Sequence, residues 1–192
     1  MPLTNHSEHK LKNTLEIKEF LEKHPLPPGH CLASLDVKSL FTCIPHDFAI
    51  NAMKIALQNS NFISSTTLLN SDEILRLVQI CLSSTTIQWN NKIYSQITGT
   101  PMGSPISVVV AELSMQFLED QLIQNSSDSL HFWKRYVDDI LIGIPEHKLI
   151  YFIVNLNNIS SVKSYTDEIA FIEGYRTFFG HHRYQYILIP LP

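Results

Sequence analysis

The feature that most constrains this chain is the stretch Tyr-Val-Asp-Asp at residues 136–139, which lies between two apolar runs at 130–133 and 140–142. This pattern predicts a strand, a tight turn that carries two carboxylates, and a returning strand. Adjacent aspartates repel each other, and a fold tolerates them at low cost only in full solvent or beside a bound cation. Because Asp is a common turn residue, the stretch taken alone favours an ordinary acidic hairpin.

Composition sets broad limits on the class of protein. The 192 residues suffice for one domain with a core, and 44% hydrophobic against 17% charged residues exclude a disordered chain. The apolar runs are too short for a membrane span, and the polar residues 1–10 do not form a signal peptide. We therefore expect a soluble intracellular protein, nuclear or cytoplasmic. The net charge of −4 argues against unaided nucleic-acid binding, which usually needs a basic surface.

Neither cysteine nor histidine spacing indicates a metal site of the zinc type. Cys31, Cys43 and Cys81 lie in apolar or partly apolar contexts, without paired spacing, and are expected to be buried free thiols. His181 and His182 are adjacent, and neighbouring side chains on a strand point to opposite faces, so zinc binding there is not expected.

Hydrophobic periodicity and turn residues predict an α+β domain with a mostly antiparallel sheet. The expected elements, in order, are a helix over 13–23, a strand over 31–36, a helix from 47 to about 57, a helix from 70 to about 82, a hairpin over 85–97 that turns at Asn90-Asn91, a helix from Pro105 to about 123, the carboxylate hairpin, and a helix over 146–157. From residue 162 onward the chain looks strand-like and less regular.

Two further stretches carry candidate chemistry. Asp36 ends a buried strand, where a lone carboxylate is costly unless it is paired or metal-bound, although helix capping or turn formation would also explain it. Residues 96–105 form a Gly/Pro-rich turn that runs into a helix. Such a turn offers free backbone N–H groups to a phosphate or a sugar edge, and a plain turn with Pro as first helical residue explains it equally well.

Taken together, Asp36, Asp138 and Asp139 fit the carboxylates of a two-metal site. Such sites hold two Mg²⁺ ions about 3.5–4 Å apart, which activate a hydroxyl and stabilise a leaving phosphate oxygen. Mg²⁺ prefers oxygen ligands and takes few protein groups, so two or three carboxylates with substrate phosphates suit it.

The three stretches, in this order, resemble motifs A, B and C of a reverse-transcriptase palm. They read Asp-Val-Lys-Ser-Leu-Phe from Asp36, Gly-Thr-Pro-Met-Gly-Ser-Pro from Gly99, and Tyr-Val-Asp-Asp from Tyr136. Residues 39–46, Ser-Leu-Phe-Thr-Cys-Ile-Pro-His, are similar to the Penelope-like retroelements, in which Asn stands in place of Cys43. The resemblance covers roughly residues 13–170. It implies an α+β palm with partial fingers over 1–170 and an irregular tail over 171–192.

The resemblance also implies an activity, its ions and its partners. The activity is that of an RNA-directed DNA polymerase of a retrotransposable element, a nucleotidyltransferase that adds dNTPs to a primer 3′-OH. Two Mg²⁺ ions, or Mn²⁺ in their place, would serve as cofactors. RNA would be the template and DNA the primer.

Individual residues inherit roles from the same resemblance. Asp36, Asp138 and Asp139 would be catalytic, and the metal ligands would be Asp36, Val37, Asp138 and Asp139. The nucleotide would be bound by Lys38, Ser39, Leu40, Phe41, Gln96, Gly99, Pro101 and Gly103. Primer and template would lie near Ser104, Pro105 and Tyr136. Phe41 would be the steric gate that crowds a ribose 2′-OH. Lys148 would be a general acid, although a solvated helix lysine explains it better.

Several parts of the family pattern are expected to be missing. We expect most of the fingers, the thumb and the GIY-YIG-type endonuclease of the parent polyprotein to be absent, which would explain the negative net charge. The Leu-Pro-Phe-Leu-Asp turn of the family is absent too. A one-base shift of the codons across 177–186 permits Pro-Phe-Leu-Asp-Ile-Ile-Val-Thr-Asn, so we expect a frameshift between about 169 and 176, which the coding DNA would reveal.

Three alternatives to an active polymerase remain open from sequence. The first is a catalytically inactive truncated remnant of such an element. The second is a host protein that uses the palm as an interaction module, for which the residues offer no specific support. The third is an RNA-templated RNA polymerase, and Phe41 argues against it because such enzymes need room for the 2′-OH.

Overall fold

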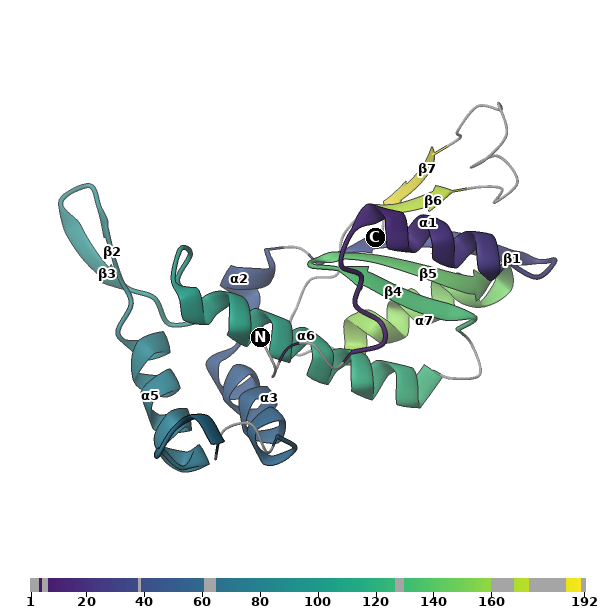
Figure 1. Cartoon of the computed structure of the whole chain (residues 1–192). Coiled ribbons are helices and arrows are strands. Elements are labelled where there is room, and N and C mark those ends of the chain that lie inside the picture. The colour runs from purple at the N-terminus through teal and green to yellow at the C-terminus, as the bar shows by residue number, and fades with distance from the viewer. Residues whose placement is uncertain are drawn as a thin grey trace. The chain divides into compact units, whose positions relative to one another are not determined.

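The computed structural model describes residues 4, 7–37, 39–60, 65–126, 130–159, 168–172 and 186–190. The chain divides into two compact units, whose elements are labelled in Figure 1. The helical unit comprises Met1–Ser7 and Ser39–Asp120, and the sheet unit comprises Glu8–Lys38 and Gln121–Pro192. Among the described residues, no helix is both long enough and apolar enough to cross a bilayer.

A five-stranded sheet with the order β4-β5-β1-β6-β7 forms the base of the sheet unit (Figure 1). Its strands are β1 (His30–Asp36), β4 (Phe132–Tyr136), β5 (Asp139–Pro145), β6 (Glu168–Ile172) and β7 (Tyr186–Pro190). Every neighbouring pair is antiparallel, which confirms the predicted sheet. Leu32 and Ala33 of the central strand β1 are both buried, although their side chains point to opposite faces, as predicted for a strand covered on both sides.

Two helices cover the opposite faces of this sheet. On one face, Leu21 of α1 (Thr14–Lys23) packs with Leu32 and Phe132. On the other face, Phe152 of α7 (Glu146–Ile159) meets the Trp133 ring, with 6.4 Å between the ring centroids. Adjacent strand residues point to opposite faces, so the Phe-Trp pair at the start of β4 anchors one helix on each side.

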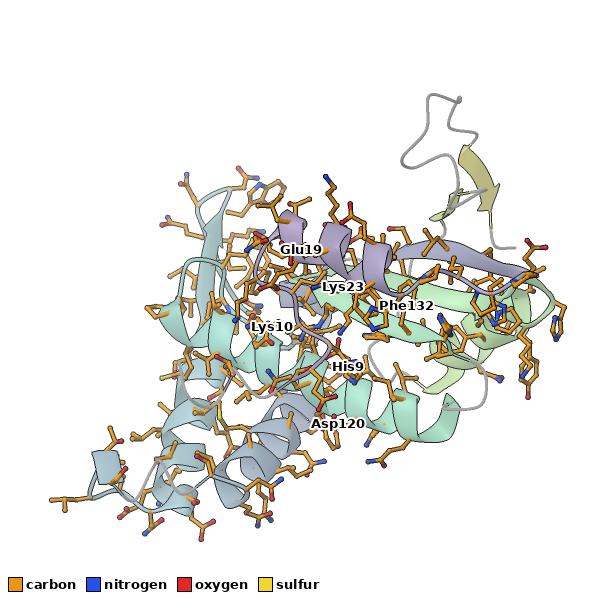
Figure 2. All side chains as sticks on the ribbon, turned by 45° about the vertical axis from the view of Figure 1, so that its right-hand side comes forward. His9, Lys10, Glu19, Lys23, Asp120 and Phe132 are labelled. Atoms are coloured by element: carbon orange, nitrogen blue, oxygen red, sulfur yellow. The ribbon has the colours of Figure 1, made fainter. Side chains whose placement is uncertain are left out.

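The N-terminal segment runs along the outer edge of β4. The Arg135 amide donates to the His9 carbonyl at 2.8 Å, and the Leu11 amide donates to the Arg135 carbonyl at 2.7 Å. Lys10 forms a parallel bridge with Arg135, and Figure 2 labels His9 and Lys10 on this segment. The segment pairs with backbone groups of β4 that an edge strand would otherwise leave open to another chain.

Helices and one hairpin make up the helical unit. They are α2 (Leu40–Cys43), α3 (His46–Gln58), α5 (Ser71–Ser83), β2 (Thr86–Trp89), β3 (Lys92–Ser95) and α6 (Pro105–Ser126), whose last residues belong to the sheet unit. Asn90 and Asn91 both have positive φ, which is the backbone of a type I′ turn and confirms the predicted hairpin. The short α2 was not predicted, because one helical turn shows no periodicity.

Local capping explains where two of the predicted helices begin. The Asn13 side chain accepts hydrogen bonds from the first turn of α1. At α5 the Glu73 amide donates to the Asn70 side chain at 2.9 Å, and the Asn70 amide donates to the Glu73 carboxylate at 2.8 Å. This reciprocal capping box is the one that the sequence predicts.

The tail is described only in part. β7 lies within it and pairs with β6 in a regular antiparallel register. His181 and His182 lie outside the described residues. The coding DNA remains the test of the predicted frameshift.

The prediction of three buried thiols is wrong for Cys81, which is exposed, whereas Cys31 and Cys43 are partly buried. On α5 the buried side chains are Val78 and Leu82, four residues apart on one face. Cys81 stands beside that face rather than on it, and a short helix with a single buried face exposes such a position.

We expect the cysteines to differ strongly in reactivity. Burial, and secondly the charge of Glu146, raise the pKa of Cys31 to about 11 from 9.0. Because the thiolate is the reactive form, Cys31 should alkylate about a hundredfold more slowly than an unshifted thiol. A time course with iodoacetamide at pH 8, read by peptide mass spectrometry, should show Cys81 modified first. Equal rates for Cys31 and Cys81 would contradict the placement of Cys31 against β5.

Candidate active site at the β4–β5 turn

The sheet unit brings together the aspartates of motifs A and C. In the β1–β5 register Asp36 is paired directly with Asp139. The Val37 amide donates to the Asp138 carbonyl at 3.2 Å, which ties the end of β1 to the turn between β4 and β5. Paired residues share a face of the sheet, so the Asp36 and Asp139 side chains project from the same face. Asp36 and the two aspartates of motif C, which follow it in the sequence by about 100 residues, therefore lie at the same corner of the sheet.

The turn itself differs in one detail from the prediction. Asp139 is not in the turn but is the first residue of β5, paired with Tyr136, and the two turn residues are Val137 and Asp138. The tight register of β4 and β5 is the reason, since it leaves only two residues unpaired. One aspartate is thus presented by the turn and the other by the strand.

Backbone strain and a buried arginine mark this turn. Val137 has a φ of 58°, a conformation that a β-branched residue rarely adopts and that costs roughly 1–3 kcal/mol. Arg135 is fully buried, and its guanidinium Nη1 donates to the Val137 carbonyl at 2.9 Å. Sequence reasoning missed Arg135. The sequence does contain a clue: Arg135 stands two residues after the apolar Trp133 in a predicted strand, so both side chains are expected on the same, buried face.

The carboxylates interact electrostatically. The pKa of Asp36 is raised, first by burial and then by the negative charges of Asp138 and Asp139, against the opposing effect of the Val37 amide. Asp36 and Asp139 are exposed and Asp138 is partly buried, so all three can be reached from solvent. A cation placed among them would relieve this repulsion.

In the helical unit, the Gly-rich loop of motif B holds the backbone of Phe41. The Phe41 carbonyl accepts hydrogen bonds from the Thr100 amide at 2.5 Å and from the Thr100 Oγ1 at 3.1 Å. The Gly99 amide donates to the Ile44 carbonyl at 2.9 Å, and His46 Nε2 lies 2.8 Å from the Gly99 carbonyl. Thr100 and His46 were missed by sequence reasoning, because only the fold places them beside motif A.

The two glycines of this loop have different surroundings. Gly99 has a φ of 77°, and a Cβ there would lie 2.5–2.6 Å from backbone atoms of Thr42 in α2. Gly103 has a φ of 86°, but a Cβ there would meet nothing within 4 Å. Gly99 is therefore required for the contact between the loop and α2, whereas Gly103 is required only for its backbone conformation.

The remaining predicted residues are placed as follows. Val37 and Leu40 are buried, at 3% and 5% exposure. Ser39 has a φ of 55° and precedes α2 as its N-cap. The Gln96 side-chain amide donates to the Thr98 carbonyl at 2.9 Å. Tyr136 is 48% exposed.

The three other candidates are Pro101, Lys38 and Lys148. Pro101 accepts a hydrogen bond from the Ser104 amide at 3.3 Å, directly before Pro105 opens α6. Lys38 lies outside the described residues. Lys148 is in the first turn of α7, beyond the opposite end of β5 from Asp139. The length of β5, about 20 Å or more, separates that end from the carboxylates and excludes Lys148 as their general acid.

The sequence of residues 4–168 matches the family model described as reverse transcriptase (RNA-dependent DNA polymerase). The chain belongs to the reverse transcriptase family. No curated protein sequence matches the chain significantly.

Solved structures similar to this reverse transcriptase chain include yeast telomerases. Apo telomerase from Candida tropicalis, truncated from its C-terminal domain, has a TM-score of 0.60 at 11% identity, over 93% of this chain and 38% of that one. Candida albicans telomerase in complex with the TWJ fragment of telomeric RNA has a TM-score of 0.62 at 14% identity, over 91% of this chain and 34% of that one. The chain thus spans a little over a third of these telomerases and shares their palm fold.

The aspartates of this reverse transcriptase can be tested for their fit to the divalent ions that its family generally uses. Among the described residues, no group of three or more His, Cys, Asp or Glu side chains is arranged to hold a metal ion by itself. Mg²⁺ at phosphoryl-transfer sites is usually held by one or two carboxylates, with substrate phosphates and water completing its shell. The carboxylates of Asp36, Asp138 and Asp139 are hard oxygen donors that repel one another at a solvent-exposed corner. They therefore fit a Mg²⁺ ion whose remaining ligands come from substrate and water.

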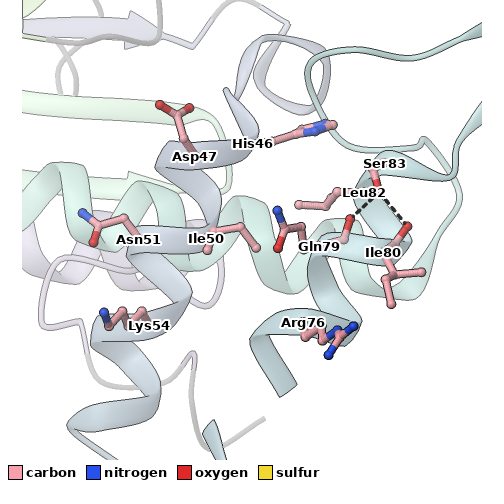
Figure 3. Close-up of a pocket in the computed structure, with 10 residues that line it drawn as sticks. All are labelled: His46, Asp47, Ile50, Asn51, Lys54, Arg76, Gln79, Ile80, Leu82 and Ser83. Atoms are coloured by element: carbon pink, nitrogen blue, oxygen red, sulfur yellow. Dashed lines mark hydrogen bonds between the residues drawn. The ribbon is translucent and has the colours of Figure 1, made fainter. Parts of the chain in front are cut away.

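A separate cavity of about 800 Å³ lies between α3 and α5 of the reverse transcriptase (Figure 3). The charged side chains that line it are Asp47, Lys54 and Arg76. His46, which contacts the Gly99 carbonyl, lines it too, but none of the residues predicted from sequence does. The catalytic prediction therefore depends on the open corner at the β4–β5 turn and not on this cavity.

Proposed function

We propose that this chain carries the nucleotidyl-transfer centre of an RNA-directed DNA polymerase. The pairing of Asp36 with Asp139 beside the strained turn that presents Asp138 is the observation that supports it. Stability alone does not explain this arrangement, because it places repelling carboxylates together and holds a valine in an unfavourable conformation.

In the proposed reaction, the primer 3′-OH attacks the α-phosphate of a dNTP in line and gives up its proton to solvent. A new P–O bond forms, the bond from the α-phosphorus to the α–β bridging oxygen breaks, and pyrophosphate leaves. Asp36 and Asp138 would hold two Mg²⁺ ions with Asp139 as the adjacent acid, and the Val37 carbonyl would complete the ligand set. The ions would supply activation of the hydroxyl and stabilisation of the leaving oxygen. The chain itself contributes positioning and fixed charge.

Residues of motif A and of motif B would each contact the nucleotide. The backbone of residues 37–40 would approach the triphosphate, and Gly99 and Gly103 would let the loop come close to the nucleotide. Phe41 would crowd the ribose 2′-OH and so favour dNTPs. Tyr136, which is half exposed beside the aspartates, would contact the primer end.

We further propose that the chain derives from a Penelope-like retroelement, with RNA as template and DNA as primer. The run Ser-Leu-Phe-Thr-Cys-Ile-Pro-His at residues 39–46 supports this branch. In this proposal residues 1–170 form the reverse transcriptase domain and residues 171–192 are a tail whose reading frame the coding DNA would test.

Primer extension tests the proposed function. The purified chain would receive an RNA template, a DNA primer, dNTPs and Mg²⁺, and each template would differ in the first unpaired base. Incorporation that follows the template base by complementarity is the expected result. A folded chain that incorporates no nucleotide would instead support a catalytically inactive remnant, for which the net charge of −4 already suggests a weak hold on nucleic acid.

Thr100→Val should weaken sugar selection. The substitution removes the Oγ1 hydrogen bond to the Phe41 carbonyl but keeps the side-chain volume and the amide hydrogen bond. We expect a loss of about 1 kcal/mol in stability and, because Phe41 would be held less firmly, a several-fold lower preference for dNTP over NTP. The measurement is the ratio of kcat/KM for the two nucleotides. Thr98→Val, at an exposed neighbouring position, is the control, and an unchanged ratio in Thr100→Val would contradict the positioning role.

A further inference from the structure

The β2–β3 hairpin has two chemically different faces. Its register pairs Ile87 with Tyr94 and Trp89 with Lys92, so these four side chains share one face, which we name the aromatic face. Every residue of both strands is exposed. The opposite face carries Thr86, Gln88, Ile93 and Ser95. One side of an exposed hairpin thus gathers both of its aromatic rings and its one cation.

The rings of the aromatic face make no ring or cation contact within the described part of the chain. Trp89 is 69% exposed and Tyr94 is 47% exposed. Exposed aromatic groups of this kind typically mark a binding surface, because aromatic side chains gain much from burial. The turn residues Asn90 and Asn91 set the register that places both rings on one face of the hairpin.

Charge favours a polyanionic ligand for this face. Lys92 is the only charged residue between Arg76 and Glu112 in the sequence, so no acidic side chain on the hairpin opposes a phosphate. Aromatic rings with a neighbouring cation are the usual surface on which proteins bind single-stranded nucleic acid, with bases stacked on the rings and the backbone near the charge.

The accessibility of base faces favours a single strand over a duplex. Trp89 and Tyr94 are diagonal neighbours across the two strands, so both rings project from the same face of the hairpin. Rings on such a face stack on unpaired bases, whereas the bases of a duplex are hidden from this contact.

The hairpin is also continuous with the proposed nucleotide site. β3 ends at Ser95, and the chain reaches the motif B loop at Gly99 within the same unit. Ile97, between β3 and the loop, is 87% exposed, and Met102, within the loop, is 75% exposed. We propose that the aromatic face stacks unpaired bases of a single-stranded nucleic acid, the template strand. The proposal depends on the proposed function only for the identity of that strand.

Tryptophan fluorescence gives a direct readout on the full chain. The chain has two tryptophans, of which Trp89 is 69% exposed and Trp133 is 2% exposed. A twelve-nucleotide oligouridylate, added in EDTA so that no chemistry can occur, should quench the exposed component of the emission. An abasic oligonucleotide of the same length should quench it far less, because it offers phosphates without bases to stack.

Variants on the two faces make the test specific. In anisotropy titrations with labelled oligouridylate, Trp89→Ala and Tyr94→Ala should each weaken binding about tenfold. Ile93→Ala, at an exposed position on the opposite face, should bind as the natural chain does. Lys92→Gln should lower the slope of log affinity against log salt by about 0.7, as expected for one phosphate contact.

Three results would overturn the proposal. The first is equal weakening by Trp89→Ala and Ile93→Ala. The second is equal binding of the abasic and the normal oligonucleotide. The third is a change from dimer to monomer in Trp89→Ala with unchanged oligonucleotide affinity, which would assign the face to a second copy of the chain. Because the titrations need no extension, a catalytically inactive chain with normal stacking would reject only the proposed function.

Discussion

Asp138→Asn is expected to reduce primer extension by at least about a hundredfold while leaving the fold intact. The amide has the shape of the carboxylate but not its charge, and Asp138 is the aspartate that the turn itself presents. The Val37 amide donates its hydrogen bond to the backbone carbonyl of Asp138, so the substitution of the side chain keeps that hydrogen bond. The loss should therefore fall on ion binding and chemistry.

The same substitution should not lower stability. The charges of Asp138 and Asp139 raise the pKa of Asp36 after burial does, so removal of one charge moves that pKa back toward its ordinary value of 3.8. A carboxyl group whose pKa is raised in the folded state destabilises the folded protein when it is ionised. This destabilisation disappears as the pH falls and Asp36 becomes protonated. Without metal, Asp138→Asn should thus unfold at an equal or higher temperature at pH 7, and the difference should vanish below about pH 3.8.

The experiment pairs extension assays with thermal unfolding in EDTA. Asp72→Asn, an exposed carboxylate in the first turn of α5, is the control and should retain extension. A destabilised Asp138→Asn chain would show that the carboxylate stabilises the turn rather than holding an ion. Extension that survives in a folded Asp138→Asn chain would refute the proposed site.

The sequence was sufficient for elements with local signals. The Asn70 and Glu73 capping box, the Asn90-Asn91 turn and the return of the chain at residues 136–139 each depend on neighbours within a few positions. The convergence of Asp36 with the motif C aspartates is a long-range contact. It was expected because the three stretches together resemble a known palm, and periodicity alone did not indicate it.

What the sequence did not indicate depends on partners distant in the chain. Arg135, in β4, donates a hydrogen bond to the Val137 carbonyl, and no local sequence pattern predicts which acceptor a buried arginine will use. Thr100 and His46 each join the loop of motif B to a distant part of the chain. Thr100 Oγ1 donates to the Phe41 carbonyl, 59 residues earlier, and His46 Nε2 contacts the Gly99 carbonyl, 53 residues later. Cys81 was misassigned because its exposure depends on how α5 packs.

Gly99→Ala should be among the most destabilising single substitutions in the helical unit. A left-handed backbone costs alanine about 1–2 kcal/mol, and the added Cβ would also overlap backbone atoms of Thr42 that no rotamer change can move. We expect a total loss of about 3–5 kcal/mol, enough to unfold a marginally stable chain. Urea unfolding at low temperature, followed by circular dichroism, measures it.

Gly103→Ala is the matched control, because its backbone is equally left-handed while its surroundings are open. It should cost only about 1–2 kcal/mol, and the difference between the two variants isolates the contact with α2. Since α2 begins directly before Phe41, a Gly99→Ala chain that still folds should also lose preference for dNTP over NTP. Equal losses of stability in the two variants would mean that the loop does not lie against Thr42, and the link from motif B to the predicted gate would fail with it.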